Sequence, residues 1–170
     1  KSQTGMEQMP ERKLARRKAA SELKRGLILD AARQVFEAEG LDGASLRAIA
    51  AQAGYTAAAL YFYYDSKEAI YADVLRASLA SLGEAVQKAT ARATAPQDRL
   101  RAAAMAFFRF YAENPGDLDL GFYLFRGGMK PKGLGRERDL MLNGALGAAL
   151  QPSAEAAIAL GGGEEEANLL

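Results

Sequence analysis

Residues 45–70 read SLRAIAAQAGYTAAALYFYYDSKEAI, and this stretch decides the fold. It opens with Ser45, a residue type that often caps a helix N-terminus. The apolar side chains that follow share one helical face, namely Leu46, Ile49, Ala50 and Ala53. Gly54 favours the end of this helix, and a second short helix is expected over residues 56–64. Two short helices joined by a turn that contains glycine are typical of a helix-turn-helix.

Helical patterns flank this stretch on both sides. Upstream, residues 21–39 predict a helix whose buried stripe is Ile28, Ala31, Ala32 and Val35, with Phe36 beside it, and Gly40 suits its end. Downstream, Asp65 and Glu68 have the spacing of a capping box that opens a long helix ending before Pro96. The core-facing stripe of that helix is Leu75, Leu79, Leu82 and Val86. Further helices are expected over residues 97–113, 136–150 and 154–159, and no segment alternates as a strand would. The sequence therefore predicts an all-α protein.

The composition excludes several classes of function. The chain has no Cys and no His, so zinc sites, disulfides and histidine-based nucleophilic catalysis are not available to it. The glycines at 161–163 lack the Lys that follows in a phosphate-binding loop. We therefore expect no enzyme activity, no catalytic residue, no metal and no cofactor. No apolar run approaches about 18 residues and no signal peptide is visible, so we expect a cytoplasmic protein without a membrane partner.

Positive charge is concentrated near the start of the chain, although the net charge is only +1. The first thirty residues carry eight Lys or Arg against four Asp or Glu. Such a segment can neutralise DNA phosphates, although a solubilising tail has the same composition. We expect residues 1–20 to form a flexible basic arm.

Residues 21–72 resemble the tetracycline-repressor-like (TetR) family of bacterial regulators. The residues in register with the family's helix-turn-helix pattern are Ser45, Arg47, Ile49, Ala50, Ala53, Gly54, Thr56, Leu60, Tyr61, Tyr63, Ser66, Lys67 and Glu68. Upstream matches are Ile28, Ala31, Ala32, Phe36 and Gly40. Three positions depart from the pattern: Tyr55 replaces a small aliphatic residue, Ala58 a glycine, and Tyr64 a phenylalanine.

The resemblance implies a three-helix DNA-binding domain over residues 21–66 and a helical ligand-binding and dimerisation domain over residues 67–170. The helical pattern that begins in GGGEEEANLL stops at Leu170, and we leave open whether the natural chain continues.

The second helix of such a motif enters the major groove with its N-terminal end at the base edges. The expected DNA-contacting residues are Ser45, Arg47, Tyr55, Thr56, Ala57, Ala59, Tyr61, Tyr63 and Lys67. Thr56 can offer its hydroxyl and backbone N–H to a phosphate, the hydroxyls of Tyr61 and Tyr63 can reach the backbone, and the Lys67 ammonium suits a phosphate. Taken singly, Tyr61 could equally be core, and Arg47 and Lys67 solvated surface charges.

Base readers are scarce in this helix. The side chains of residues 57–59 are alanines, which offer only apolar contacts, for instance to thymine methyl groups. The remaining candidates are Arg47, Tyr55, Thr56 and Phe62. We therefore expect specificity to depend on van der Waals fit, on DNA shape and on the basic arm in a minor groove.

The C-terminal half contains a zone rich in aromatic residues and methionine, which suggests an effector site. Its expected ligand-binding residues are Met105, Phe108, Tyr111, Phe122, Tyr123 and Arg126, and the effector would be a largely apolar small molecule. Ordinary core packing explains any one of these residues as well.

The sequence thus predicts a TetR-like regulator, a repressor by resemblance, that binds palindromic operator DNA as a homodimer and is released by an effector. The two recognition helices would lie about 34–36 Å apart. The alternative is a helical ligand-binding or protein-interaction module without sequence-specific DNA binding, which the alanine-rich recognition helix motivates. The effector, the operator and the choice between repression and activation stay open.

Overall fold

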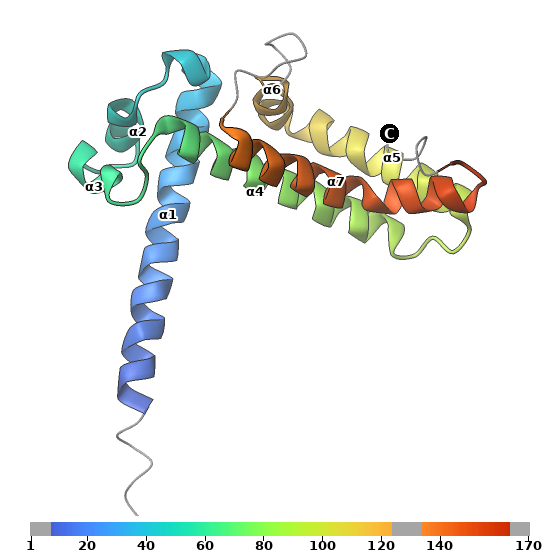
Figure 1. The fold of residues 1–170 in the computed structure, drawn as a ribbon, viewed down its shortest axis with the longest axis horizontal. Coiled ribbons are helices and arrows are strands. Elements are labelled where there is room, and N and C mark those ends of the chain that lie inside the picture. The colour runs from blue at the N-terminus through green and yellow to red at the C-terminus, as the bar shows by residue number, and fades with distance from the viewer. Residues whose placement is uncertain (1–7, 124–133, 164–170) are drawn as a thin grey trace, which may run out of the picture. The chain divides into compact units, whose positions relative to one another are not determined.

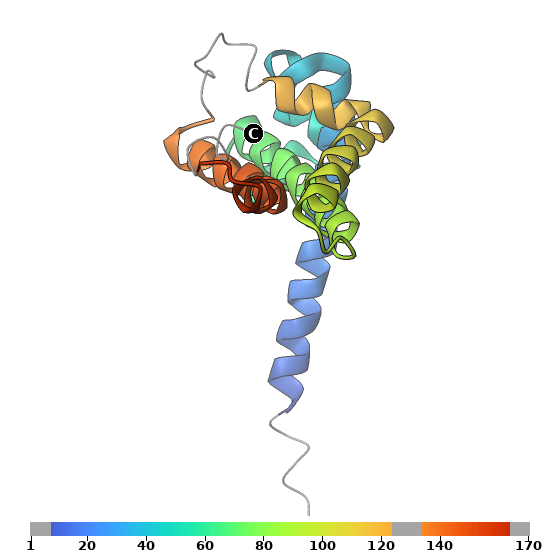
Figure 2. The same cartoon turned by 90° about the vertical axis from the view of Figure 1, so that its right-hand side faces the viewer.

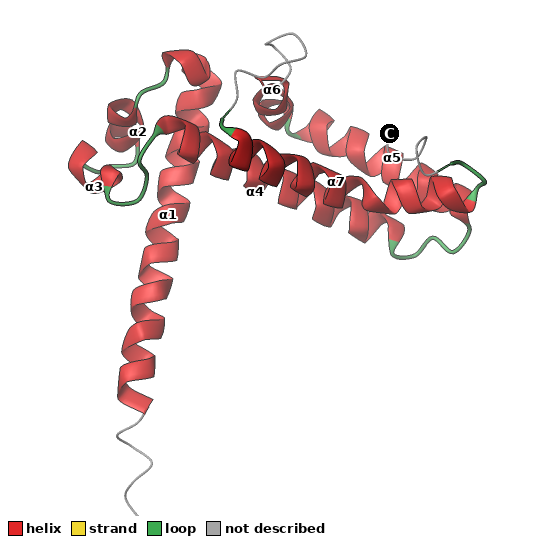
Figure 3. Ribbon diagram, in the orientation of Figure 1, coloured by secondary structure: helices red, strands yellow, loops and turns green. Residues whose placement is uncertain are grey.

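The computed structural model describes residues 8–123 and 134–163, which form helices joined by short loops and contain no strand (Figures 1 and 3). The helices are α1 (Gln8–Gly43), α2 (Leu46–Gln52), α3 (Ala57–Tyr61), α4 (Lys67–Thr90), α5 (Pro96–Glu113), α6 (Pro115–Tyr123) and α7 (Arg136–Ala159). The prediction of an all-α fold is confirmed. The chain divides into two compact units, Lys1–Ile70 and Tyr71–Leu170, and α4 begins in the first and continues into the second. Within the described ranges, none of the helices combines the length and apolar character that a membrane crossing requires.

The first helix is longer than the sequence pattern indicated. We expected it over residues 21–39, after a flexible arm over residues 1–20, but α1 is helical from Gln8 onward. Lys, Arg, Glu and Ala dominate residues 11–25, and these are good helix formers, which explains the extension. Gly40 interrupts the helix with φ 68° and ψ 175°, a conformation that is almost confined to glycine. Gly40 was predicted to end the helix, and it instead introduces a kink near the C-terminal end of α1.

The core of the first unit is built where the apolar stripes predicted it. Ile28, Ala31, Ala32, Val35 and Phe36 are all buried. The α1 helix packs against α2, and α2 packs against α3. The inward side chains of these partners are Ile49, Ala50, Leu60 and Tyr64. The helices α2 and α3 are too short to persist alone and are therefore stabilised by the apolar core that they share with α1.

In the second unit, α4, α5 and α7 run alongside one another, as Figure 1 shows along their length and Figure 2 shows nearly end-on. The predicted α4 stripe of Leu75, Leu79, Leu82 and Val86 is buried. A Cβ placed on Gly83 would lie 3.5 Å from the Cα of Ala149, so these small residues allow α4 and α7 to approach closely. The buried hydroxyl of Tyr71 donates to the backbone carbonyl of Leu120 and ties α4 to α6.

Two expectations for this unit need correction. We predicted separate helices over residues 136–150 and 154–159, but α7 continues through Pro152, although proline removes one N–H donor and its ring crowds the carbonyl of Ala148. The second concerns the helix expected over residues 97–113, whose apolar pattern of Leu100, Ala104, Phe107, Phe108 and Tyr111 would predict a buried face. In α5 the buried residue is instead Ala103, and the Phe108 side chain is 69% exposed.

Candidate functional site

The turn between α2 and α3 is closed by backbone hydrogen bonds that require glycine. The Gly54 N–H donates to the Ala51 carbonyl at 3.1 Å, and the Tyr55 N–H donates to the Ala50 carbonyl at 2.8 Å. This pair of bonds is the Schellman arrangement, and Gly54 has the positive φ of 73° that the arrangement needs. The turn therefore sets the angle between α2 and α3 through local chemistry that the sequence displays.

Side-chain caps fix where the two short helices begin. The Ser45 hydroxyl accepts the Ala48 N–H at 3.1 Å, as predicted, and the Thr56 hydroxyl accepts the Ala59 N–H at 3.2 Å. The long helix α4 also begins with a side-chain N-cap, one residue later than expected. Its cap is the Ser66 hydroxyl, which accepts the Ala69 N–H at 3.2 Å and donates to the Asp65 carboxylate. The predicted capping box between Asp65 and Glu68 is therefore replaced by a serine cap.

Helix α3 presents a defined outer surface. Leu60 is completely buried and points into the unit. Ala58, Tyr61 and Phe62 are exposed, and their spacing of i, i+3 and i+4 places them on one helical face. The Tyr61 side chain is 59% exposed and the Phe62 side chain 87%. We call these three residues the α3 stripe.

The tyrosine that replaces the family's usual phenylalanine has a structural partner. Tyr64 is buried, and its hydroxyl accepts a hydrogen bond of 3.0 Å from the Nε of Arg25 on α1. The guanidinium carbon of Arg25 also lies 5.1 Å from the centre of the Tyr64 ring, in cation–π geometry. The segment after α3 is thus bound to α1 by a contact between residues 39 positions apart.

Lys67 lies at the start of α4, but its ammonium is directed to the end of α1. The Nζ donates to the carbonyl of Asp42 at 3.1 Å and to the carbonyl of Ala44 at 3.0 Å. A positive charge at these carbonyls neutralises the negative end of the helix dipole. The same contact holds the corner from which α2 starts, because Ser45 follows Ala44 directly.

The structure buries none of the residues predicted to contact DNA. Exposed members of that set are Ser45, Arg47, Thr56 and Tyr61. Half-buried members are Tyr55, Ala57, Ala59, Tyr63 and Lys67. That set omitted Ala58, and it omitted Phe62, which had been named only as a candidate base reader; both are more exposed than Ala57 and Ala59. The period of the motif could have identified them, since both lie away from the inward Leu60.

The basic segment at the N-terminal end of α1 is exposed on all sides. Residues 11–25 include seven Lys or Arg and two Glu, and all fifteen are exposed. An α-helix is about 10–12 Å wide, whereas the minor groove of DNA is about 6 Å wide. We had expected the basic arm to lie in a minor groove. In its helical form this segment is too wide to enter one, but it can contact phosphates.

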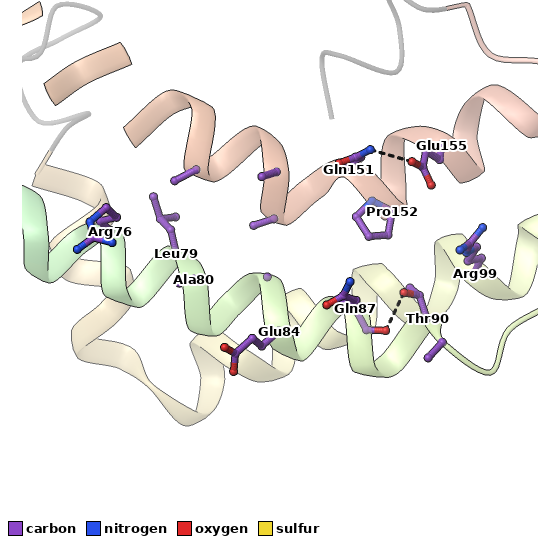
Figure 4. Close-up of a pocket in the computed structure, with 15 residues that line it drawn as sticks. Arg76, Leu79, Ala80, Glu84, Gln87, Thr90, Arg99, Gln151, Pro152 and Glu155 are labelled. Carbon is purple, nitrogen blue, oxygen red and sulfur yellow. Dashed lines mark hydrogen bonds between the residues drawn. The ribbon is translucent and has the colours of Figure 1, made fainter. Parts of the chain in front are cut away.

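The second unit contains a groove between α4 and α7, with one lining residue, Arg99, from α5 (Figure 4). Its volume is about 610 Å³. Small apolar residues of the two helices, such as Ala80, Gly83 and Ala149, form part of its wall. Four charged residues also line it, namely Arg76, Glu84, Arg99 and Glu155. A ligand with both apolar and charged groups suits such a lining.

None of the described side chains predicted to bind an effector lines this groove. Met105 is 49% exposed and Phe108 is 69% exposed, both on α5. Tyr111 is half-buried, and burial together with the nearby Asp117 raises the pKa of its hydroxyl. The side chains of Phe122 and Tyr123, and all of Arg126, lie outside the described residues. A ligand-binding role for this set stays a prediction.

Comparison with known proteins gives a consistent result. Residues 28–74 match the family model of the bacterial regulatory proteins of the tetR family. The chain is 38% identical over 87 residues to the HTH-type transcriptional activator FasR of Mycolicibacterium smegmatis, across 51% of this chain and 40% of FasR. It is 30% identical over 107 residues to the HTH-type transcriptional repressor NicS of Pseudomonas putida, across 63% of this chain and 50% of NicS.

A solved structure of a tetR-family bacterial regulatory protein from Rhodococcus RHA1 shares the fold, with a TM-score of 0.68 at 24% identity. That likeness covers 81% of this chain and 71% of the Rhodococcus chain. The sequence matches cover only 40% and 50% of the two curated relatives. The matched segment contains the helix-turn-helix described above, and the fold beyond it also agrees. Residues 28–74 are therefore similar to the tetR family of bacterial regulatory proteins, and the fold of the described residues resembles that of a solved tetR-family protein.

Proposed function

We propose that this chain is a transcriptional regulator that binds a palindromic operator as a homodimer and releases it when a small molecule binds. The observation that carries the proposal is the capped helix-turn-helix, in which the α3 stripe, Ser45 and Arg47 are all exposed to solvent. The basic residues 11–25 supply the charge that attracts DNA phosphates. Such a regulator acts in the cytoplasm, where bacterial operator DNA lies.

Binding to DNA is tested by fluorescence anisotropy with duplexes from the chromosomal region that surrounds the gene. We expect the logarithm of the binding constant to fall linearly with the logarithm of salt concentration, because phosphate contacts release counterions. An absence of binding at every salt concentration would refute the proposal. A reporter gene placed behind the operator measures the sign of regulation, which we expect to be repression.

The homodimer is supported by apolar side chains that the second unit leaves in solvent. Phe108 on α5 is 69% exposed, and Leu140 and Ile158 on α7 are 64% and 44% exposed. Large apolar side chains exposed on the neighbouring helices α5 and α7 are suited to an interface between protomers. Light scattering of the purified chain, alone and with operator, measures the stoichiometry. One protomer per palindrome would contradict the dimer.

The effector would occupy the groove between α4 and α7. The α4 helix carries groove residues and also Lys67, so the same helix contains part of the ligand site and the residue that contacts the end of α1. A ligand releases DNA only if it binds the non-binding conformation more tightly. An Ala80→Leu variant should narrow the groove and abolish ligand-induced release, while affinity for DNA without ligand stays the same.

A second candidate is a ligand-binding or protein-interaction module that does not read a DNA sequence. The absence of polar side chains on residues 57–59 favours it, because alanines cannot form hydrogen bonds with bases. Selection of duplexes from a random pool distinguishes the two candidates. An enriched palindrome supports the regulator, and salt-dependent binding without any enriched sequence supports the module.

A further inference from the structure

The α3 stripe is an unusual surface for a segment that faces solvent. Of the large apolar side chains described, Phe62 is the most exposed, at 87%. Its ring contacts the edge of Tyr63, with the ring centres 5.6 Å apart, and this contact leaves most of the ring in water. Ala58 lies one turn away on the same face. A large aromatic ring kept in water at this position suggests that a partner covers it.

The stripe has few groups that could form hydrogen bonds with a base. Ala58 and Phe62 have none in their side chains, so the Tyr61 hydroxyl is the one such side-chain group of the stripe. Outside the stripe, the Thr56 oxygen already accepts the Ala59 N–H. In the major groove, the apolar feature that distinguishes one base from the others is the 5-methyl group of thymine. An apolar face that reads sequence in that groove is therefore restricted mainly to contacts with thymine methyl groups.

The charge of the same unit selects DNA over an apolar protein surface as the partner. Residues 11–25 carry a net charge of +5, counted as seven Lys or Arg less two Glu, and all are exposed. Phosphate backbones are the complement of such a charge, and they would bring the stripe to the base edges.

We propose that the α3 stripe recognises thymine methyl groups, so that the operator is defined by thymines at fixed positions in each half-site. This inference rests on the proposed function, because it names the base feature that the DNA-binding surface reads. Phe62 is its principal specificity-determining residue. Tyr61, the preceding residue of the stripe, and Thr56, the N-cap of α3, can contact the DNA backbone.

The test compares duplexes that differ only in the methyl group. Two random pools are used for selection, one made with thymine and the other with deoxyuridine in every thymine position. We expect a palindrome with fixed thymines from the first pool. Replacing one contacted thymine by deoxyuridine should weaken binding about fourfold, as for the burial of one methyl group, and a symmetric pair should weaken it about fifteenfold.

A Phe62→Ala variant completes a double-mutant cycle with the deoxyuridine duplexes. The variant should lose the preference for thymine at the contacted position, and Phe62→Leu should keep part of that preference. Because the Phe62 side chain is exposed, both variants should unfold at the wild-type temperature, which is measured alongside.

The outcomes separate this inference from the proposed function. If wild-type protein binds thymine and deoxyuridine operators equally, or if Phe62→Ala retains the thymine preference, the inference is wrong and the regulator proposal stands. Salt-dependent binding without an enriched sequence from either pool also overturns it. Failure to bind DNA from both pools at every salt concentration refutes the proposed function itself.

Discussion

Replacing Lys67 by methionine tests whether this residue acts at a phosphate or at the end of α1. The variant keeps the aliphatic stem and removes the ammonium that donates to the carbonyls of Asp42 and Ala44. Hydrogen bonds from a charged donor contribute about 1.5–3 kcal/mol each, with values at the low end where solvent competes. Because one of the two bonds is exposed, we expect the free energy of unfolding to fall by about 2 kcal/mol.

The same variant should bind operator DNA more weakly without a change in salt dependence. Loss of the contact loosens the corner that holds Ser45 and α2, which lowers affinity but removes no phosphate contact. If Lys67 instead bound one phosphate in each protomer, the slope of log K against log salt would decrease in magnitude by about 1.8 per dimer. Urea titrations supply the free energy of unfolding. Anisotropy titrations from about 50 to about 300 mM KCl supply the slope of log K against log salt.

Arg47→Met is the matched control. Arg47 is exposed, so its variant should leave the unfolding free energy unchanged and reduce the salt slope, which is the opposite pair of effects. A Lys67→Met protein that keeps wild-type stability and loses about 1.8 from the slope would refute the positioning role.

Three further substitutions test the packing around these elements. Gly40→Ala should lower the unfolding free energy by about 1–3 kcal/mol in urea titrations, because the backbone there has φ 68° and ψ 175°; a neutral effect would contradict the kink. Tyr71→Phe leaves the buried carbonyl of Leu120 without its donor and should cost about 1–3 kcal/mol, unlike a substitution of an exposed tyrosine. Burial, and then the charge of Asp117, raises the pKa of Tyr111, so the folded chain holds that proton more tightly than the unfolded chain. The contribution of Tyr111 to stability is therefore complete below the unfolded-state pKa of about 10 and is lost as the pH rises past it. The Tyr111→Phe variant should show a smaller fall in melting temperature above that pH. A melting profile identical to wild type at alkaline pH would disprove the assignment.

Local patterns predicted the helix-turn-helix well because its determinants lie within a few residues of one another. The caps at Ser45 and Thr56 bond to N–H groups three positions away, and Gly54 closes its turn with residues that directly precede and follow it. The apolar stripe of α1 was equally readable, since period alone places it. The family resemblance covered the same residues, and the match over residues 28–74 confirms it.

Predictions failed where the burial of a side chain depends on residues that are distant in the sequence. The aromatic pattern of α5 suggested a buried face, but the described neighbours cover Ala103 and leave Phe108 in solvent. The groove likewise combines α4 with α7, segments about 70 residues apart, so no local pattern marks it. The effector site was predicted only from the aromatic composition of one zone, and none of the described residues of that zone lines the groove.

The sequence by itself determined most of the helices, the turn between α2 and α3, and the likeness of residues 28–74 to the tetR family, because each depends on residues close together in the chain. Only the tertiary structure decided what the side chains do. Lys67 reaches carbonyls 23 and 25 positions away, Arg25 reaches Tyr64 across 39, and Phe62 is left outside because Leu60 takes the inward place. Those outcomes follow from how folded helices meet, which the order of residues along the chain does not display.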